Sequence, residues 1–190
     1  MIENNFSGRK TTFDRELHAK IFKFHFDSLY NYGMKITRDP ELVKDSIQDL
    51  FYRLWKNNID LHKIINIKPY LLKGLRRQIL NVYDLKYHQI HKVEITENTQ
   101  IEFSPEDYFI NNQGEEALRK RVLDALNNLS PKQREAVYLR YFEELDYSEI
   151  ADIMNINIQS VKNNVQRALD SLRELLTLLM FFHLIGKTVN

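Results

Sequence analysis

The sequence predicts an all-α protein built from two small helical domains. Its 190 residues include only 5 Gly and 4 Pro, and few stretches alternate polar and apolar residues as a half-buried strand does. Apolar residues recur instead every three or four positions, between residues that typically begin or end helices. A chain of this length is enough for one large domain or two small ones.

The composition excludes several classes of protein. Hydrophobic residues make up 43% and charged residues 28% of the chain, a balance typical of a soluble globular protein, and there is no cysteine. Neither a disulfide framework nor a thiolate zinc site is therefore possible. Residues 1–10 are polar and lack the apolar stretch of a secretory signal, so we expect a cytoplasmic protein. No phosphate-binding loop, nucleophile elbow or zinc motif occurs, and no cofactor or metal is predicted.

Three helices are predicted in the first half of the chain. The first covers residues 12–34, and Asp39 with Pro40 begins the second as N-cap and first-turn proline. The third covers residues 67–89. Their expected apolar stripes are, in order, Phe13, Leu17, Ile21, Phe22, Phe26, Leu29 and Tyr30; Ile47, Leu50, Phe51, Leu54 and Trp55; and Tyr70, Leu71, Leu75, Ile79 and Val82. Gly74 costs the third helix about 1 kcal/mol relative to Ala, which close packing against a neighbouring helix would explain.

Charge is distributed unevenly around the end of the third helix. Residues 67–92 hold six Lys or Arg against one acid, whereas residues 93–116 hold seven acids and no base. Residues 90–114 also lack helical periodicity and contain Ser-Pro and Asn-Asn-Gln-Gly, which is typical of a linker. A helix from about residue 115 to 128 is expected to begin the second domain.

Residues 129–172 predict a helix followed by a helix-turn-helix. Ser130 and Pro131 begin one helix, which Val137, Tyr141 and Leu145 continue at helical spacing. Asp146 and Glu149 resemble a capping box at the start of the next helix. Asn155 lies at the sharp turn, because Asn tolerates a left-handed backbone, and Asn157 caps the last helix. The inward stripe of that helix is Ile158, Val161, Val165, Ala168, Leu169 and Leu172.

The outward face of the last helix carries amide, hydroxyl and cationic side chains that suit base edges and phosphates. They are Gln159, Ser160, Lys162, Asn163, Asn164, Gln166 and Arg167. An ordinary solvated helix face is the alternative, but two caps and a tight turn favour insertion into a DNA major groove.

The stretch from Val43 to Trp55 resembles the conserved-region-2 helix of sigma-70-type factors, in particular the extracytoplasmic-function (ECF) group. The resemblance is carried by Asp45, Gln48, Asp49, Phe51, Leu54 and Trp55. The helix-turn-helix is similar to region 4 of the same family, and both motifs together cover residues 13–175. Two places depart from the family pattern. Arg76-Arg77 stands where Arg-Asn is frequent, and Asn155 stands where Gly is usual.

The resemblance implies a region 2-like domain over residues 10–89, an acidic linker over 90–114, a region 4-like domain over 115–180 and a tail over 181–190. It implies that Asp45, Gln48, Asp49 and Tyr52 bind core RNA polymerase, although a solvated face is the alternative. Contacts to the promoter −10 element are implied for Lys73, Arg76, Arg77, Tyr83 and Lys86, with Tyr70 and Tyr87 offering further rings on which unpaired bases stack. The outward face of the last helix would read the −35 element.

These roles predict an alternative sigma factor, which recruits polymerase to promoter DNA and is itself no enzyme, since polymerase supplies the catalysis. An anti-sigma factor is an expected partner, and no membrane insertion is expected. A stand-alone helix-turn-helix regulator and a sigma-like decoy without initiation activity remain alternatives. The linker can span about 80 to 90 Å, enough to join DNA elements about 35 to 70 Å apart.

His88 and His91 have the i, i+3 spacing of a shared metal site on a helix, but without a third ligand we expect surface histidines. Residues 175–185 are almost wholly apolar and too short for a membrane span. They either fold back onto their own domain or form an interaction surface, for example for an anti-sigma partner.

Overall fold

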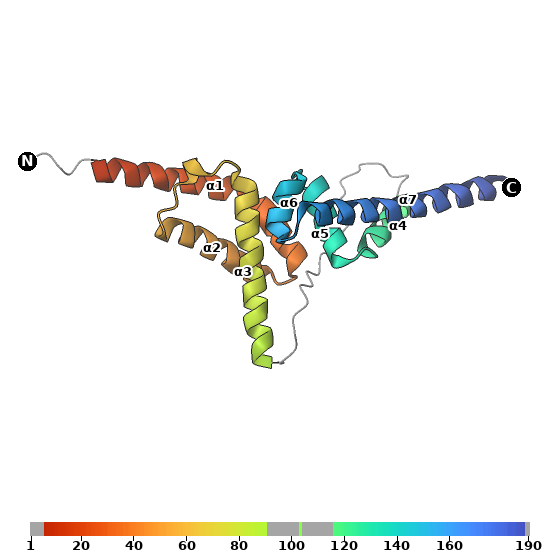
Figure 1. The fold of residues 1–190 in the computed structure, drawn as a ribbon, viewed down its shortest axis with the longest axis horizontal. Helices are drawn as coiled ribbons and strands as arrows, with labels where there is room; N and C mark the ends of the chain where they lie inside the picture. The colour runs from red at the N-terminus through yellow and green to blue at the C-terminus, as the bar shows by residue number, and fades with distance from the viewer. Residues whose placement is uncertain (1–5, 91–102, 104–115, 189–190) are drawn as a thin grey trace, which may run out of the picture. The chain divides into compact units, whose positions relative to one another are not determined.

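The computed structural model describes the backbone of residues 6–90, 103 and 116–188, and the side chains of residues 15–82, 103 and 120–173. Over these residues the chain forms seven α-helices and one short 3-10 helix, with no strand (Figure 1). The all-α prediction is therefore confirmed. The chain divides into two compact units, Met1–Glu97 (unit 1) and Asn98–Asn190 (unit 2).

Unit 1 is a bundle of three helices that all contact one another. Its elements are α1 (Phe6–Ile36), α2 (Pro40–Lys56), the 3-10 helix η1 (Leu61–Lys63) and α3 (Ile67–Ile90) (Figure 1). α1 begins six residues before the predicted residue 12. The side chains packed most completely inside the bundle are Leu29, Tyr32, Val43, Ile47, Leu71, Leu72, Leu75 and Ile79.

The start of α2 follows the predicted capping chemistry. The Asp39 carboxylate accepts hydrogen bonds from the Glu41 and Leu42 N–H groups at 3.1 and 3.0 Å. Pro40 occupies the first turn, where its missing N–H leaves no hydrogen bond unmade. The entry to α2 is thus determined by residues adjacent in sequence.

Gly74 marks a close crossing of α2 and α3. A Cβ atom built on it would lie 2.7 Å from Leu50 Cδ1, and one built on Gly33 of α1 would lie 2.6 Å from Val43 Cγ1. Neither distance is sterically possible without a shift of the facing side chain. The expectation that a neighbouring helix explains Gly74 is confirmed.

Unit 2 consists of α4 (Glu116–Asn127), α5 (Pro131–Tyr141), α6 (Tyr147–Met154) and α7 (Ile158–Thr188). α7 contacts each of the other three helices. The core includes Leu139, Ile150, Val161, Val165 and Ala168. α7 continues as one helix past residue 180 to Thr188, so its backbone does not fold back. The side chains of the apolar segment 175–185 lie outside the described residues.

The expectation that the helix beginning at Pro131 continues to Leu145 was wrong in detail. α5 ends at Tyr141 and does not reach Leu145, because Glu144 adopts a left-handed backbone with φ 57°. The Leu145 N–H then bonds the Leu139 carbonyl at 3.1 Å, which brings Leu145 into the core from a loop.

Some residues at the edges of predicted stripes are also exposed. They are Trp55, Tyr70, Ile158 and Leu169. Trp55, Tyr70 and Leu169 each lie one helical step from a buried neighbour, and a step of about 100° carries a side chain from the centre of a buried face to its edge. Ile158 is the first residue of α7, three positions before the buried Val161.

Among the described residues no helix is long and apolar enough to cross a bilayer. No group of three potential metal ligands occurs in the same part of the chain either. The His88 and His91 side chains lie outside it.

Candidate nucleic-acid interface

The helix-turn-helix of unit 2 forms as its capping residues predict. Asp146 accepts from the Ser148 and Glu149 N–H groups, both at 2.8 Å, while Glu149 Oε2 accepts from the Asp146 N–H at 2.9 Å. α6 ends at Asn155, whose φ of 55° and ψ of 45° are left-handed. Asn157 then accepts from the Ser160 N–H at 2.7 Å. These local bonds determine where α6 ends and where α7 begins.

Asp146 is held in its charged form by the same contacts. The Ser148 hydroxyl donates to its Oδ1 at 2.6 Å, and this bond, followed by the Glu149 N–H, lowers the pKa of the carboxyl below 3.8. A negative charge at a helix N-terminus also opposes the helix dipole favourably. The cap of α6 therefore favours the ionised form of Asp146.

The outward face of α7 is polar and accessible. Of the seven predicted reading residues, five are exposed, and Ser160 and Asn164 are half-buried. Gln159 Nε2 donates to Asn163 Oδ1 at 2.9 Å, and Gln166 Nε2 donates to Asp170 Oδ1 at 3.0 Å. The amides are thus oriented along the helix. Such exposed amides can exchange these partners for base edges.

The ring of Tyr147 on α6 contacts two cationic side chains, and the sequence did not predict this arrangement. The Arg140 guanidinium carbon lies 5.0 Å from its ring centroid, and Lys162 Nζ lies 5.9 Å from it. Arg140 also donates to the Leu145 carbonyl at 2.7 Å. Cations so placed are attracted to the ring face. The Tyr147 ring of α6 is thereby in contact with one cation from α5 and one from α7.

The outward face of α2 gathers the four residues predicted to bind polymerase. Asp45, Gln48, Asp49 and Tyr52 are all exposed, opposite the buried stripe that contains Ile47. Tyr52 has 60% of its surface accessible. α2 therefore presents carboxylate, amide and phenol groups on one accessible surface.

Asp49 also has an internal partner. Its Oδ2 accepts a hydrogen bond of 3.0 Å from Nε2 of Gln78 on α3. Gln78 is 9% exposed, and its carbonyl oxygen Oε1 is buried without a hydrogen-bond partner. A residue predicted from its exposed position thus joins two helices of the bundle.

α3 presents only part of its predicted basic set. Lys73 and Arg77 are exposed, but Arg76 is 6% exposed. It lies four residues after Leu72 and three before Ile79, which places it on the inward face of the helix. Arg76, which the resemblance implied as a phosphate contact, is therefore buried in the free chain. The side chains of Tyr83, Lys86 and Tyr87 lie outside the described residues.

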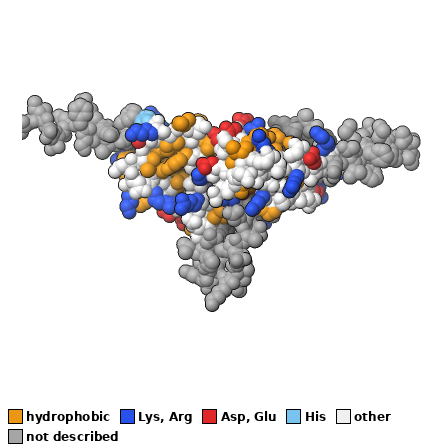
Figure 2. Space-filling model, viewed as in Figure 1, with side chains coloured by type: hydrophobic (Ala, Val, Ile, Leu, Met, Phe, Trp, Pro, Cys, Tyr) orange, Lys and Arg blue, Asp and Glu red, His pale blue; other side chains and the backbone are white. Residues whose placement is uncertain are grey.

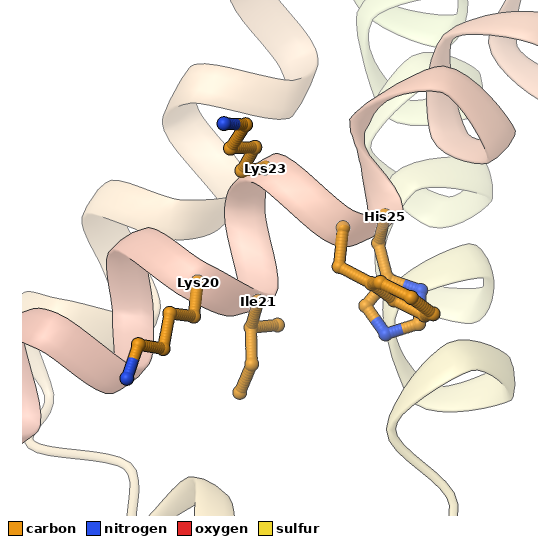
Figure 3. A pocket seen from close by; sticks show the side chains of 5 residues that line it. Lys20, Ile21, Lys23 and His25 are labelled. Atoms are coloured by element: carbon orange, nitrogen blue, oxygen red, sulfur yellow. The ribbon is translucent and has the colours of Figure 1, made fainter.

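Hydrophobic side chains also reach the surface of unit 1. Figure 2 shows them in orange over the helices of that unit, with blue Lys and Arg side chains along the edge. Lys20, Ile21, Lys23, Phe24 and His25 of α1 line a hollow (Figure 3). Phe24 is 82% exposed, and its ring meets His25 edge-on at 4.9 Å. The sequence had assigned Phe24 no role.

Phe103 is the described residue of the predicted linker, and it is packed into unit 2. Its side chain is 4% exposed and contacts the rings of Phe142 and Tyr138 at centroid distances of 5.4 and 6.4 Å. Its N–H donates to Asn127 Oδ1 at 2.8 Å, and its carbonyl accepts from Asn127 Nδ2 at 3.1 Å. Burial of a Phe side chain stabilises by about 1.5 to 3 kcal/mol. Nothing in the sequence predicted this contact.

Comparison with known proteins supports the region 4 resemblance directly. Residues 119–172 match the family model described as Sigma-70, region 4. These residues contain α5, α6 and the described outward face of α7. The matched segment therefore coincides with the helix-turn-helix and the helices that support it.

Full-length relatives and solved structures extend the likeness to both units. The chain is 27% identical to "ECF RNA polymerase sigma factor SigM" of Bacillus subtilis, over 82% of this chain and 93% of that protein. It is 29% identical to "RNA polymerase sigma-E factor" of Streptomyces coelicolor, over 78% and 79%. The fold is similar to that of the sigma factor RpoE in complex with the anti-sigma factor NepR from Bartonella quintana, with TM-score 0.55 and 21% identity over 84% and 96% of the two chains. For CnrH in complex with the cytosolic domain of CnrY the TM-score is 0.53, with 16% identity over 86% and 89%.

Proposed function

We propose that the chain belongs to the ECF group of sigma-70-type factors and is an alternative sigma factor that binds core RNA polymerase and directs initiation to its own set of promoters. One observation carries most of this proposal. A helix-turn-helix with an accessible polar reading face occurs in the same chain as a separate helix bundle with an accessible acidic face. A regulator that only binds duplex DNA has no need of the second surface.

The outward face of α2 is the proposed polymerase-docking surface. It consists of Asp45, Gln48, Asp49 and Tyr52, all accessible to a partner. Tyr52 supplies apolar area at the C-terminal end of this surface, and buried aromatic anchors commonly dominate binding energy. Because Asp49 already bonds Gln78 within the bundle, we assign the main docking roles to Asp45, Gln48 and Tyr52.

α3 is the proposed −10 contact. Lys73 and Arg77 are exposed and can neutralise phosphates, and Tyr70 is accessible enough for an unpaired base to stack on it. Tyr83 and Lys86 stay in the proposed set on the sequence alone. Arg76 leaves it because its side chain is buried.

α7 is the proposed −35 reading helix, with Gln159, Asn163 and Gln166 as candidates for base edges and Lys162 and Arg167 for phosphates. Base contacts and phosphate contacts can be distinguished by the salt dependence of DNA affinity. Lys162→Ala should weaken binding to all duplexes alike and reduce the salt slope by about 1. Gln166→Ala should instead relax sequence preference and leave the salt slope unchanged. Equal slopes for Lys162→Ala and the wild type would remove Lys162 from the phosphate set.

An anti-sigma partner forms part of the proposal. One solved structure named above holds the sigma factor RpoE together with the anti-sigma factor NepR, and this chain shares its fold. We place the chain in the cytoplasm, where core polymerase works, and assign it no catalytic group of its own.

The first experiment is transcription from fragmented genomic DNA by bacterial core polymerase, with and without the chain, followed by sequencing of RNA 5′ ends. New starts that share two spaced upstream motifs are expected. Stable association with core but no new starts would favour a decoy. Absence of both would favour a stand-alone regulator.

The docking surface has its own test. Asp45→Ala, Gln48→Ala and Tyr52→Ala together should abolish association with core while helical content stays the same. Asp49 is left intact so that its bond to Gln78 survives. The matched control, Asp124→Ala with Asp152→Ala, removes two exposed carboxylates from unit 2 and should bind core normally. Normal binding by the α2 variant would place the docking surface elsewhere.

A further inference from the structure

The ring of Tyr147 lies where three helices of unit 2 meet. Tyr147 is the first residue of α6, and its side chain is half-buried. The Arg140 guanidinium reaches the ring from the last turn of α5, and the Lys162 ammonium reaches it from the second turn of α7. Both cations are within about 6 Å of the ring centroid, the range in which a cation is attracted to an aromatic face. One ring therefore links a cation from each neighbouring helix.

Arg140 is the fixed member of this arrangement. Its side chain is half-buried, and Nη1 donates to the Leu145 carbonyl at 2.7 Å. The same guanidinium attracts the Asp146 carboxylate. Leu145, Asp146 and Tyr147 are consecutive, so Arg140 contacts every residue of the segment that leads into α6. The Tyr147 ring is thus held in place by its neighbours before any partner binds.

Lys162 is the adaptable member. It is exposed, and among the described residues it takes part in no ion pair. A lysine has a long flexible stem and loses much rotamer freedom when its ammonium is bound. Attraction to the Tyr147 ring restricts this freedom already in the free chain. A side chain restricted in advance loses less entropy when it meets its ligand.

The place of the ring also determines where the ammonium lies. Lys162 Nζ is beside the first residue of α6. In a helix-turn-helix the second helix enters the major groove, whereas the first helix crosses the sugar-phosphate backbone. An ammonium drawn from α7 toward the start of α6 is therefore drawn toward phosphates and away from base edges.

We propose that Tyr147 is a positioning residue that holds Lys162 for contact with a DNA phosphate. The inference rests on the proposed function, in which α7 reads the −35 element. Tyr147 acts through Lys162, and the attraction depends on the face of its ring and not on its hydroxyl. A cation–π contact at an exposed site changes an equilibrium constant by about two- to fivefold. This factor sets the size of the expected effect.

The experiment is a double-mutant cycle on the full chain, with affinity measured for a duplex that carries the upstream motif of its transcription starts. Tyr147→Leu keeps an apolar side chain without the ring and should weaken binding about two- to fivefold. Tyr147→Phe keeps the ring and should bind like the wild type. Lys162→Ala should cost less affinity in the Tyr147→Leu background than in the wild type, by the same factor. An equal cost in both backgrounds would overturn the proposal.

Tyr141→Leu is the matched control. Tyr141 is a tyrosine of α5 in the same unit, it is 51% exposed, and among the described residues no cation lies over its ring. This variant should bind the duplex like the wild type. A loss as large as that of Tyr147→Leu would show that removal of any tyrosine near the motif weakens binding. A loss in Tyr147→Phe equal to that in Tyr147→Leu would assign the effect to the hydroxyl and would also overturn the proposal.

Nuclear magnetic resonance of the free wild-type chain tests the arrangement without DNA, and also without a variant if Tyr147→Leu fails to fold. The ring current of Tyr147 should shift the Lys162 Cε protons upfield of those of Lys120, an exposed lysine of the same unit. Unshifted Lys162 protons would overturn the proposal even if the chain binds DNA. Shifted protons in a chain that neither binds a duplex nor starts transcription would overturn the proposed function instead, and with it the role of the contact in DNA binding.

Discussion

At the scale of single residues, Asp49 shows how an exposed position can still be structural. Its carboxylate is on the proposed docking surface, yet it accepts the hydrogen bond that joins α2 to Gln78 of α3. A buried amide that loses its partner costs about 1 to 3 kcal/mol. Substituting Asp49 therefore disturbs the bundle as well as any interface, and the two effects must be separated.

The substitution Gln78→Glu separates the effect on the bundle from the effect on the interface, because it leaves the docking surface unaltered. It places a second carboxylate beside Asp49, and like charges at this distance repel one another. We expect a loss of about 1 to 3 kcal/mol in the free energy of unfolding at neutral pH. Urea unfolding followed by circular dichroism measures this loss of stability. Adding Asp49→Asn should restore most of the loss, and a double variant as unstable as Gln78→Glu would contradict the pairing.

Asp146 gives a prediction about pH. Its folded-state pKa is lowered, chiefly by the Ser148 hydroxyl, so its ionised form is favoured by folding. Stability from this group is fully present above the unfolded pKa, near 3.8, and is lost as pH falls through the lower folded value. The melting temperature of Asp146→Ala should lie below that of the wild type at pH 6. The difference between the two melting temperatures should disappear below pH 4. A difference that stays constant from pH 6 to 2.5 would contradict this prediction.

At the scale of helices, the crossing of α2 and α3 depends on the absence of one side chain. Gly74→Ala gains about 1 kcal/mol of helix propensity. It also places a methyl group 2.7 Å from Leu50 Cδ1 in a packed interior. Overpacking typically costs about 1 to 3 kcal/mol.

We therefore expect Gly74→Ala to destabilise unit 1 by about 1 kcal/mol net, measured by urea unfolding. Leu50→Ala alone removes buried contacts and should also destabilise. Together the two changes should cost less than the sum of the single losses, because the new methyl group enters the space that Leu50 vacates. Strict additivity would mean that Gly74 and Leu50 do not compete for the same space.

At the scale of the whole molecule, two separate cores predict two separate unfolding events. Leu72 is buried within unit 1 and Leu139 within unit 2. Truncation of a buried leucine to alanine costs about 2 to 5 kcal/mol. In calorimetry Leu72→Ala should lower one transition and Leu139→Ala the other. If either variant shifted the whole profile, the units would be stabilising one another.

Sequence reasoning was most accurate where chemistry is local. The caps at Asp39, Ser130, Asp146 and Asn157 each act on a backbone group two or three residues away, and all four form as predicted. The left-handed turn at Asn155 is equally local. Periodicity also identified the buried centres of the stripes. It was inaccurate at their edges, where Trp55 and Leu169 are exposed, because periodicity does not fix the width of a contact.

The same distinction, between what neighbours in sequence determine and what tertiary packing determines, applies to the candidate sites. The sequence located the polar faces of α2 and α7, since spacing along one helix determines which residues share a face. It assigned Arg76 to the surface by charge alone, although the packing of α3 buries that side chain. It also missed the two cations beside Tyr147, because that contact joins three different elements.

By itself the sequence determined that the chain is helical, where most helices begin, and which motifs it carries, because these depend on neighbours along the chain. Only the tertiary structure decided that Gln78 reaches Asp49 from 29 residues away, and that Phe103 pairs with Asn127 across 24 residues. Partners so distant are brought together by packing of whole helices, and neither spacing nor composition specifies that arrangement.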